Sequence, residues 1–134
     1  MTCSSVLIVE DEIFIAVEME EIIRDLGHRP VGIADDLDSA MAKASNDIDI
    51  ALVDVNLADG ATGPVIGAKL AGEYAIQVVF VTANPTQLGD GVEGTLGAVE
   101  KPVGMDRLKE VLDYVAARTE DATTPAPATM KLFG

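Results

Sequence analysis

The sequence predicts a doubly wound α/β domain with a five-stranded parallel sheet, and three observations lead to this prediction. Five short apolar runs recur along the chain, and several lack in/out alternation, which is typical of strands buried on both faces. Segments with helical periodicity separate these runs, in an order that implies right-handed crossovers and three layers. The 134 residues, 49% of them apolar, suffice for one packed core.

The elements follow one another along the chain. We expect strands at residues 6–9, 30–34, 50–55, 76–82 and 96–99. A helix with one apolar stripe ends at Gly27. Its stripe consists of Ile15, Met19, Ile22, Ile23 and Leu26. Further helices are expected at about 36–45 and 64–73, and a last one at 105–118. The stripe of that last helix consists of Leu108, Val111, Leu112 and Val115.

Two stretches depart from this regular pattern. Where a fourth helix would be expected, residues 84–95 contain a proline and several glycines, so we predict a short turn and a loop. Residues 1–118 form the expected domain, and the Thr, Ala and Pro composition of 119–134 predicts a disordered tail. The tail ends in a few apolar residues, which we interpret as a fraying chain end rather than a docking hook. They are Met130, Leu132 and Phe133.

Charge and composition exclude several kinds of partner. The chain has 23 acidic and 9 basic residues, a formal net charge of −14 that would repel a nucleic-acid backbone. No apolar run approaches membrane-spanning length, and the first run lacks the basic leader of a signal peptide. Cys3 is the only cysteine, which fits a reducing compartment. We therefore expect a cytoplasmic protein that binds neither nucleic acids nor membranes.

Polar residues gather where the predicted strands end. In an open parallel sheet, binding sites form beyond the carboxyl ends of the strands. The residues at these ends are Glu10, Asp11 and Glu12 for the first strand, Asp54 and Asn56 for the third, Thr82 for the fourth and Lys101 for the fifth. Asp54 is the most informative, because it interrupts an apolar strand where an unpaired carboxylate is costly to desolvate. It therefore needs a cation nearby.

The carboxylates suit a hard metal ion. Asp11 and Asp54 together form an oxygen site of the kind that Mg²⁺ prefers. We expect Asp11 to bind the metal directly and Glu10 to act through a metal-bound water. The backbone carbonyl of Asn56 would complete the coordination shell.

The same group of residues is arranged for phosphoryl transfer, in which a protein mainly positions groups and neutralises the phosphoryl oxygens. Asp54 would be the nucleophile. The hydroxyl of Thr82 and the ammonium of Lys101 would hold the phosphoryl oxygens on the resulting acyl phosphate.

Four motifs resemble those of the response-regulator receiver (CheY-like) family, over about residues 5–117. They are residues 7–12 (LIVEDE), 51–56 (ALVDVN), 81–83 (VTA) and 100–102 (EKP). The resemblance implies a flavodoxin-like fold, Mg²⁺, and an aspartyl phosphate at Asp54 donated by a sensor histidine kinase or a histidine phosphotransfer protein. It also implies a cis peptide bond before Pro102. The family's chemistry is self-catalysed phosphoryl acceptance and slow dephosphorylation, so we do not expect an enzyme that turns over substrate.

The sequence departs from the common receiver pattern at two further places. The loop at 56–63, with residues 82–85, is similar to receivers of bacterial general-stress-response regulators. Ala98 stands where many receivers carry a Tyr or Phe whose rotation reports phosphorylation. With no output domain in the sequence, we expect a stand-alone receiver, a monomer or weak dimer. It would signal to an unknown output protein through protein contacts, or act as a phosphoryl shuttle or sink.

Receivers dock their phosphodonor through the first helix and the loop after the conserved lysine. By this resemblance, Phe14, Val103 and Gly104 are the candidate docking residues. We hypothesise that Phe14 contacts a helical bundle of the donor. A separate hypothesis, suggested by the composition of the 84–95 loop, is that output comes from ordering of that loop.

Three other kinds of protein fit the sequence less well than a receiver. A receiver-like binding module that is not phosphorylated would be expected to lack Asp54, Thr82 or Lys101, and all three are present. A flavin-binding protein would need a hydroxyl- and glycine-rich loop after the first strand. A haloacid-dehalogenase-type phosphatase would carry its nucleophile on that strand.

Two other groups of residues also suggest sites but have simpler explanations. His28 follows the glycine that ends the first helix, so we expect a solvated turn residue. We interpret Asp35, Asp36 and Asp38 as helix-capping residues rather than a cation-binding loop.

Overall fold

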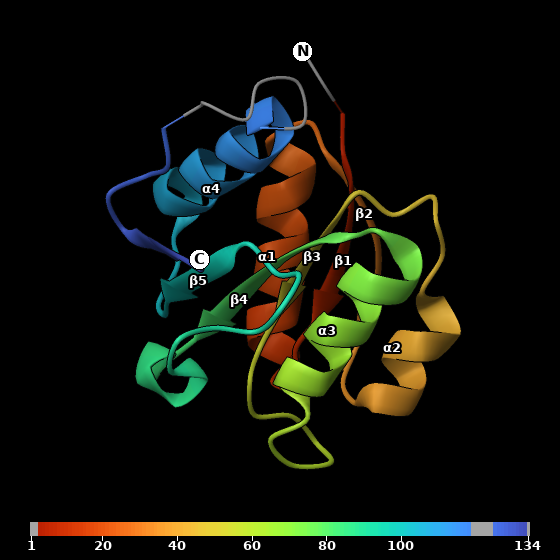
Figure 1. Ribbon diagram of the computed structural model, residues 1–134. Helices are drawn as coiled ribbons and strands as arrows, with labels where there is room; N and C mark the ends of the chain where they lie inside the picture. Colours follow the sequence, from red (N-terminus) through yellow and green to blue (C-terminus); the bar gives the residue numbers. More distant parts are fainter. Residues whose placement is uncertain (1–2, 119–124, 134) are drawn as a thin grey trace.

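Strands and helices alternate along most of the chain in the computed structural model, which describes residues 3–118 and 125–133 (Figure 1). The strands are β1 (Ser5–Val9), β2 (Arg29–Ala34), β3 (Ile50–Val53), β4 (Gln77–Thr82), β5 (Gly97–Glu100) and β6 (Met130–Leu132). The helices are α1 (Ile13–Asp25), α2 (Leu37–Lys43), α3 (Gly63–Tyr74) and α4 (Met105–Arg118), with a 3₁₀ turn η1 at Pro85–Leu88. None of the helices in the described part of the chain is long and apolar enough to cross a membrane.

Five parallel strands form the doubly wound sheet that the sequence predicts. The strand order is β2-β1-β3-β4-β5-β6. Helices α1 and α4 lie on one side of the sheet and α2 and α3 on the other (Figure 1). The direction of winding changes between β1 and β3, and in sheets of this order ligands bind beyond the carboxyl ends of the strands at that point.

Burial on both faces explains why the strands lack alternation. Every residue of β1 and β3 is buried. Along β1, Val6 and Ile8 belong to the core shared with α1 and α4, whereas Leu7 and Val9 belong to the core shared with α2 and α3. The continuous apolar runs are therefore strands covered by helices on both sides, as predicted.

The helices begin and stop close to the predicted positions. The stripe of α1 buries Met19, Ile22 and Ile23, and α4 spans the predicted residues. Helix α2 begins with a capping box, in which Asp36 accepts a hydrogen bond from the backbone N–H of Ser39 and the Ser39 hydroxyl accepts one from the N–H of Asp36. The capping role predicted for Asp36 is confirmed.

The sheet has six strands rather than the predicted five, and the sixth comes from the segment predicted to be disordered. Residues of β6 pair antiparallel with β5, Met130 with Val99 and Leu132 with Gly97. Residues 119–124 and 134 of the predicted tail lie outside the described part of the chain. A three-residue strand is too short for periodicity to reveal, because its conformation depends on pairing with β5 rather than on its own sequence.

Two other boundaries matter for the site. Strand β3 ends at Val53, so Asp54 directly follows the strand instead of lying within it. The segment at 84–95 contains only the short turn η1 and a loop with positive φ at Gly89, Gly91 and Gly94, which confirms the predicted lack of a regular fourth helix there.

Candidate functional site

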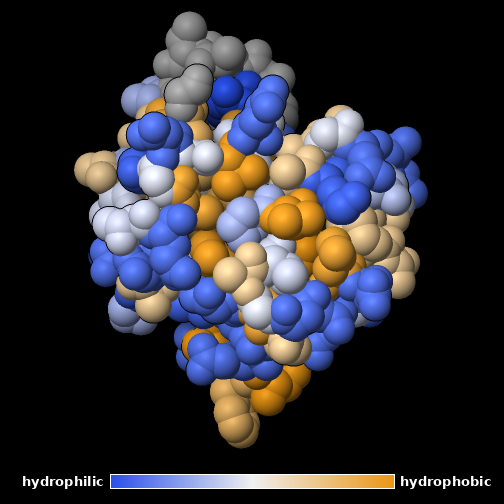
Figure 2. All heavy atoms as spheres, turned by 60° about the horizontal axis from the view of Figure 1, so that its bottom comes forward, coloured by the Kyte–Doolittle hydropathy of each residue, from blue (hydrophilic) through white to orange (hydrophobic). Residues whose placement is uncertain are grey.

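The polar residues predicted at the strand ends lie together at one edge of the sheet. Glu10, Asp54 and Lys101 directly follow β1, β3 and β5, and β4 ends at Thr82. The edge encloses a hollow of about 450 Å³, which is lined by Asp11, Glu12, Asp54, Asn56, Thr82, Ala83, Asn84, Gln87 and Lys101. On the face turned forward in Figure 2, which includes the strand ends, hydrophobic residues gather near the centre with hydrophilic residues around them.

The ammonium of Lys101 bridges two buried carboxylates at the centre of this edge. Lys101 Nζ lies 2.8 Å from Asp54 Oδ2 and also donates a hydrogen bond to Glu10 Oε1. Asp54 is 7% exposed and Glu10 3% exposed. The exposed Glu12 lies 3.9 Å from the same ammonium. One cation therefore faces three carboxylates, which leaves an excess of negative charge.

The backbone around Asp54 is held closely by the first residue of α3. The N–H of Val55 donates to Asp54 Oδ1 at 2.7 Å, and the N–H of Gly63 donates to the carbonyl of Val55 at 3.0 Å. A Cβ at position 63 would lie 2.0 Å from the carbonyl oxygen of Asp54, so only glycine fits there. This close approach holds the backbone of Asp54 and Val55 against the start of α3, and the Val55 N–H holds the Asp54 carboxylate.

Burial and the neighbouring charges shift the pKa values of two groups at this edge. Burial, opposed by the hydrogen bond from Lys101 and aided by the charge of Asp54, raises the pKa of Glu10 to about 7. Burial by itself would lower the pKa of Lys101. The hydrogen bonds to Asp54 and Glu10 outweigh this effect and hold the pKa of Lys101 above its usual value. Lys101 therefore stays charged at neutral pH, while Glu10 is poised to gain or lose a proton.

The donor set fits a divalent cation. Carboxylate oxygens of Glu10, Asp11 and Asp54 lie within 4.8 Å of one another. Carboxylate oxygens are the ligands that Mg²⁺ prefers. Asn56 lines the same hollow, and the coordinating role of its carbonyl stays a prediction. For Glu10, the sequence predicted action through a metal-bound water and missed the direct ion pair with Lys101.

Sequence reasoning also missed a residue of the η1 turn. The side-chain amides of Gln87 and Asn56 exchange hydrogen bonds of 3.0 and 3.4 Å across the hollow. Beside them, the buried Thr82 accepts a hydrogen bond from the N–H of Asn84 at its hydroxyl oxygen, at 3.2 Å. The contact between Gln87 and Asn56 could not be predicted from the sequence, because only the folded loop brings these two residues together.

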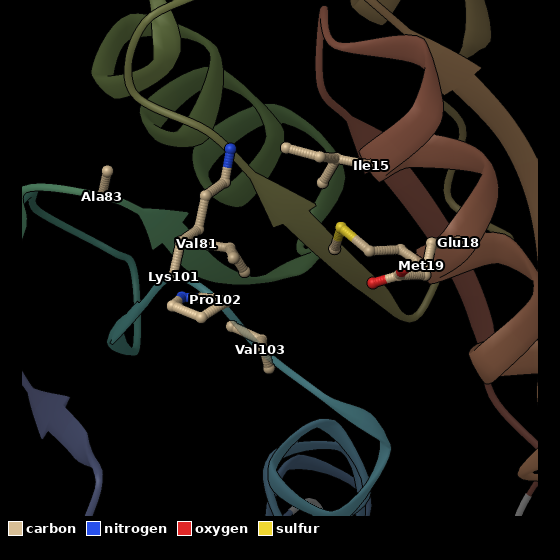
Figure 3. Close-up of a pocket in the computed structure, with 8 residues that line it drawn as sticks. All are labelled: Ile15, Glu18, Met19, Val81, Ala83, Lys101, Pro102 and Val103. Carbon is tan, nitrogen blue, oxygen red and sulfur yellow. The ribbon is translucent and has the colours of Figure 1, made fainter.

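The candidate docking residues lie close to this hollow. They come from two segments, the start of α1 and the residues after β5, and a second, apolar pocket lies between these segments. Phe14 is 90% exposed at the start of α1, and Gly104 is exposed after β5. Val103 is nearly buried and lines an apolar pocket of about 320 Å³ between these two segments (Figure 3). Phe14 is not part of the lining. The peptide bond between Lys101 and Pro102 is cis, as the resemblance implies.

One histidine contradicts its predicted environment. His28 is 8% exposed, not a solvated turn residue, and its Nδ1 accepts a hydrogen bond of 3.0 Å from the backbone N–H of Ser4. This contact lies at the amino ends of the strands, opposite the Asp54 edge. The prediction failed because a single turn residue does not reveal that the start of the chain covers it.

Comparisons with known proteins agree with this fold. The profile of one protein family, described as the response regulator receiver domain, matches residues 6–113. The phyllosphere-induced regulator PhyR of Methylorubrum extorquens is 33% identical over 90 residues, which are 66% of this chain and 34% of that protein. The chain thus spans about a third of the length of this curated relative.

Two solved structures extend the comparison. The receiver domain of the Erythrobacter litoralis PhyR response regulator superposes with a TM-score of 0.77 at 30% identity, covering 96% of this chain and 97% of that one. The anti-anti-sigma factor PhyR from Bartonella quintana gives a TM-score of 0.76 at 29% identity, covering 92% of this chain and 51% of that one.

Proposed function

Because the chain belongs to the response regulator receiver family, we propose that it accepts a phosphoryl group on Asp54 from a sensor histidine kinase or a histidine phosphotransfer protein. The observation that carries this proposal is the buried Asp54 carboxylate, hydrogen-bonded to Lys101 in a hollow that Thr82 also lines. Signalling would then pass through protein contacts, or the chain would act as a phosphoryl shuttle or sink.

The reaction follows from the groups around Asp54. A carboxylate oxygen attacks phosphorus as the P–N bond of the donor phosphohistidine breaks, and the imidazole leaves with the bonding electrons and takes up a proton. Lys101 and the hydroxyl of Thr82 donate hydrogen bonds to the transferred oxygens. Glu10, Asp11 and Asp54 would hold Mg²⁺, which supplies positive charge to the phosphoryl oxygens. Water attack later releases phosphate, so we expect acceptance without turnover of a generic phosphate ester.

Intact-mass analysis after treatment with acetyl phosphate tests this proposal. We expect a single phosphoryl adduct that requires Mg²⁺ and disappears in Asp54→Asn. Asp47→Asn is the matched control, because Asp47 is an exposed carboxylate beyond the opposite end of β3. An adduct that persists in Asp54→Asn would overturn the assignment of Asp54.

The alternative, a receiver-like module that binds partners without phosphorylation, makes the opposite prediction. It expects no adduct from acetyl phosphate and none from a panel of phosphorylated kinases and phosphotransfer proteins. Only both negative results together favour it, because some receivers refuse small donors.

The apolar pocket beside Lys101 supports a docking place for the phosphodonor. Figure 3 shows Ile15 and Met19 of α1 on one side and Pro102 and Val103 on the other, while Lys101 extends away from Pro102. A helix of the donor that covered this pocket would bring its phosphohistidine close to Lys101. Phe14, with Gly104, would contact the same helix from the rim.

Phosphotransfer kinetics from the cognate donor test this docking. We expect Phe14→Ala to slow transfer severalfold while leaving the adduct from acetyl phosphate unchanged, since the small donor needs no docking surface. Val65→Ala, which removes a half-exposed side chain from α3, is the control. Transfer to Phe14→Ala at the wild-type rate would remove Phe14 from the interface.

A further inference from the structure

The C-terminal strand β6 occupies the outer edge of β5. Its residues pair antiparallel with Gly97, Ala98 and Val99, and the N–H of Phe133 donates to the carbonyl of Leu96 at 2.9 Å. These contacts end directly before Glu100 and Lys101. The last strand of the sheet therefore lies beside the segment that carries the cation of the Asp54 edge.

Two glycines make room for this segment. A Cβ at position 97 would lie 2.2 Å from the carbonyl oxygen of Lys131, and the three nearest atoms it would meet all belong to β6. A Cβ at position 91 would lie 2.5 Å from the ring of Phe133. A side chain at position 97 would thus exclude β6, and one at position 91 would exclude Phe133, so the space that residues 130–133 occupy has a specific shape.

The side chains of the segment alternate between the two faces of the sheet. Met130 is 6% exposed and belongs to the core shared with α1 and α4. Phe133 packs on the opposite core, with its ring 6.3 Å from that of Phe80. On that same face, Lys131 Nζ donates to the carbonyl of Gly89 at 3.1 Å. The segment is anchored on both sides, although Lys131 and Leu132 remain exposed.

The loop at 84–91 contacts both residues 130–133 and the Asp54 hollow. At its start, the N–H of Asn84 donates to Thr82 and the amide of Gln87 meets Asn56. A few residues later, Gly89 and Gly91 contact the C-terminal segment. A shift of this loop toward Asp54 therefore withdraws the surface against which Lys131 and Phe133 rest.

We propose that β5 and the loop at 89–91 form a docking site for an extended segment, that residues 130–133 of the same chain are its resident occupant, and that phosphorylation of Asp54 releases them. The release rests on the proposed function. A phosphoryl group offers acceptor oxygens to Thr82 and to the amides of the loop, which draws the loop toward Asp54. Release then exposes the edge of β5, to which another strand can add.

Residues 130–133 are suited to release because few contacts hold them on β5. Three paired residues, the buried Met130, the Lys131 hydrogen bond and one aromatic ring contribute less than a helix packed along its length, and short segments with few contacts open locally at a low free-energy cost. The rest of the sheet does not depend on β6, since β5 also pairs with β4 through its whole length.

The docking is tested first in the full chain without phosphorylation. We expect Gly97→Ala to speed amide exchange of residues 128–133, and tryptic cleavage after Lys131, by about tenfold or more. Phe133→Ala should act in the same direction from the other side of the contact. Gly72→Ala is the control, because a Cβ there meets nothing within 4 Å. Unchanged protection of the segment in both variants would overturn the docking.

The occupant is tested by the oligomeric state. A segment docked within its own chain gives protection that does not depend on protein concentration. Concentration-dependent protection together with a dimer would overturn the assignment, because a second copy would then supply the strand.

The release is tested by combining intact mass with amide exchange after acetyl phosphate and Mg²⁺. An adduct together with faster exchange at 128–133 supports the release. An adduct with unchanged or slower exchange overturns the release and leaves the proposed function standing. Failure to form any adduct, from small donors or from a kinase panel, overturns the proposed function and with it the release, but not the docking measured with Gly97→Ala.

Discussion

The two ends of the parallel strands hold their polar groups in opposite ways. At the amino ends, each contact joins one donor to one acceptor: the N–H of Ser4 to His28, the N–H of Ser5 to Asp49 at 2.8 Å, and Arg29 to the hydroxyl of Ser5 at 2.8 Å. These contacts join the starts of β1, β2 and β3 to one another. The amino ends are therefore balanced and serve the fold.

At the carboxyl ends, acceptors outnumber donors. Among the described residues, Lys101 is the one cation that faces Glu10, Asp54 and the more distant Glu12, and Asp11 lies beside them. Buried like charges disfavour the folded state unless a cation or a proton compensates them. The carboxyl ends therefore keep an excess of negative charge that a bound cation can relieve, whereas the amino ends have no such excess.

The largest effect that separates the two ends is expected from Lys101→Met. The free energy of unfolding should fall by roughly 3–5 kcal/mol, because the change leaves two buried carboxylates without their cation. Urea denaturation at pH 7 without Mg²⁺ measures this loss, and Mg²⁺ should restore part of it. Lys109→Met, which breaks an exposed pair with Asp113, should change the free energy of unfolding far less, because solvent screens that pair. Equal losses in the two variants would contradict the imbalance.

A second effect concerns pH. Because the pKa of Glu10 is raised from 4.5 to about 7, the folded state binds a proton that the unfolded state releases between these values. The stability that Glu10 contributes is therefore complete below pH 4.5 and is lost as pH rises to about 7, a change of roughly 1–3 kcal/mol. Mg²⁺ affinity should rise through the same window, since metal binding needs the ionised carboxylate.

Denaturation of wild type and Glu10→Gln across pH 4.5–8 measures this contribution as a difference. The wild-type curve should fall relative to that of the variant as pH rises, because glutamine does not titrate. Parallel curves would show that Glu10 has the same pKa in both states.

The smallest effect on phosphoryl acceptance is expected from a change at the amino ends, where the loss is one of stability alone. His28→Ala leaves the buried N–H of Ser4 without its acceptor and should cost about 1–3 kcal/mol, while phosphoryl acceptance by the folded protein stays unchanged. His28→Asn offers an oxygen near the place of Nδ1 and should recover part of the loss. A large drop in acceptance at temperatures where His28→Ala remains folded would show that the two ends are coupled.

The sequence by itself determined the doubly wound sheet and the set of residues at its edge. Continuous apolar runs specify strands buried on both faces, and parallel strands must bring their carboxyl ends to one side. Glu10, Asp54, Thr82 and Lys101 each stand at such an end, so their meeting followed from topology alone. The capping role of Asp36 was equally local, since its partner Ser39 lies three residues away.

Only the tertiary structure decided which groups pair within that edge and what covers the rest of the sheet. Three contacts join segments far apart in the chain: the ion pair of Lys101 with Glu10, the hydrogen bonds between Asn56 and Gln87, and the hydrogen bond from Ser4 that accompanies the burial of His28. The strand β6 is the clearest case, because three residues gain their extended form from the edge of β5 and from the space left by Gly97. Local pattern encodes periodicity and caps, whereas contacts between distant segments depend on the positions of both partners in the folded chain.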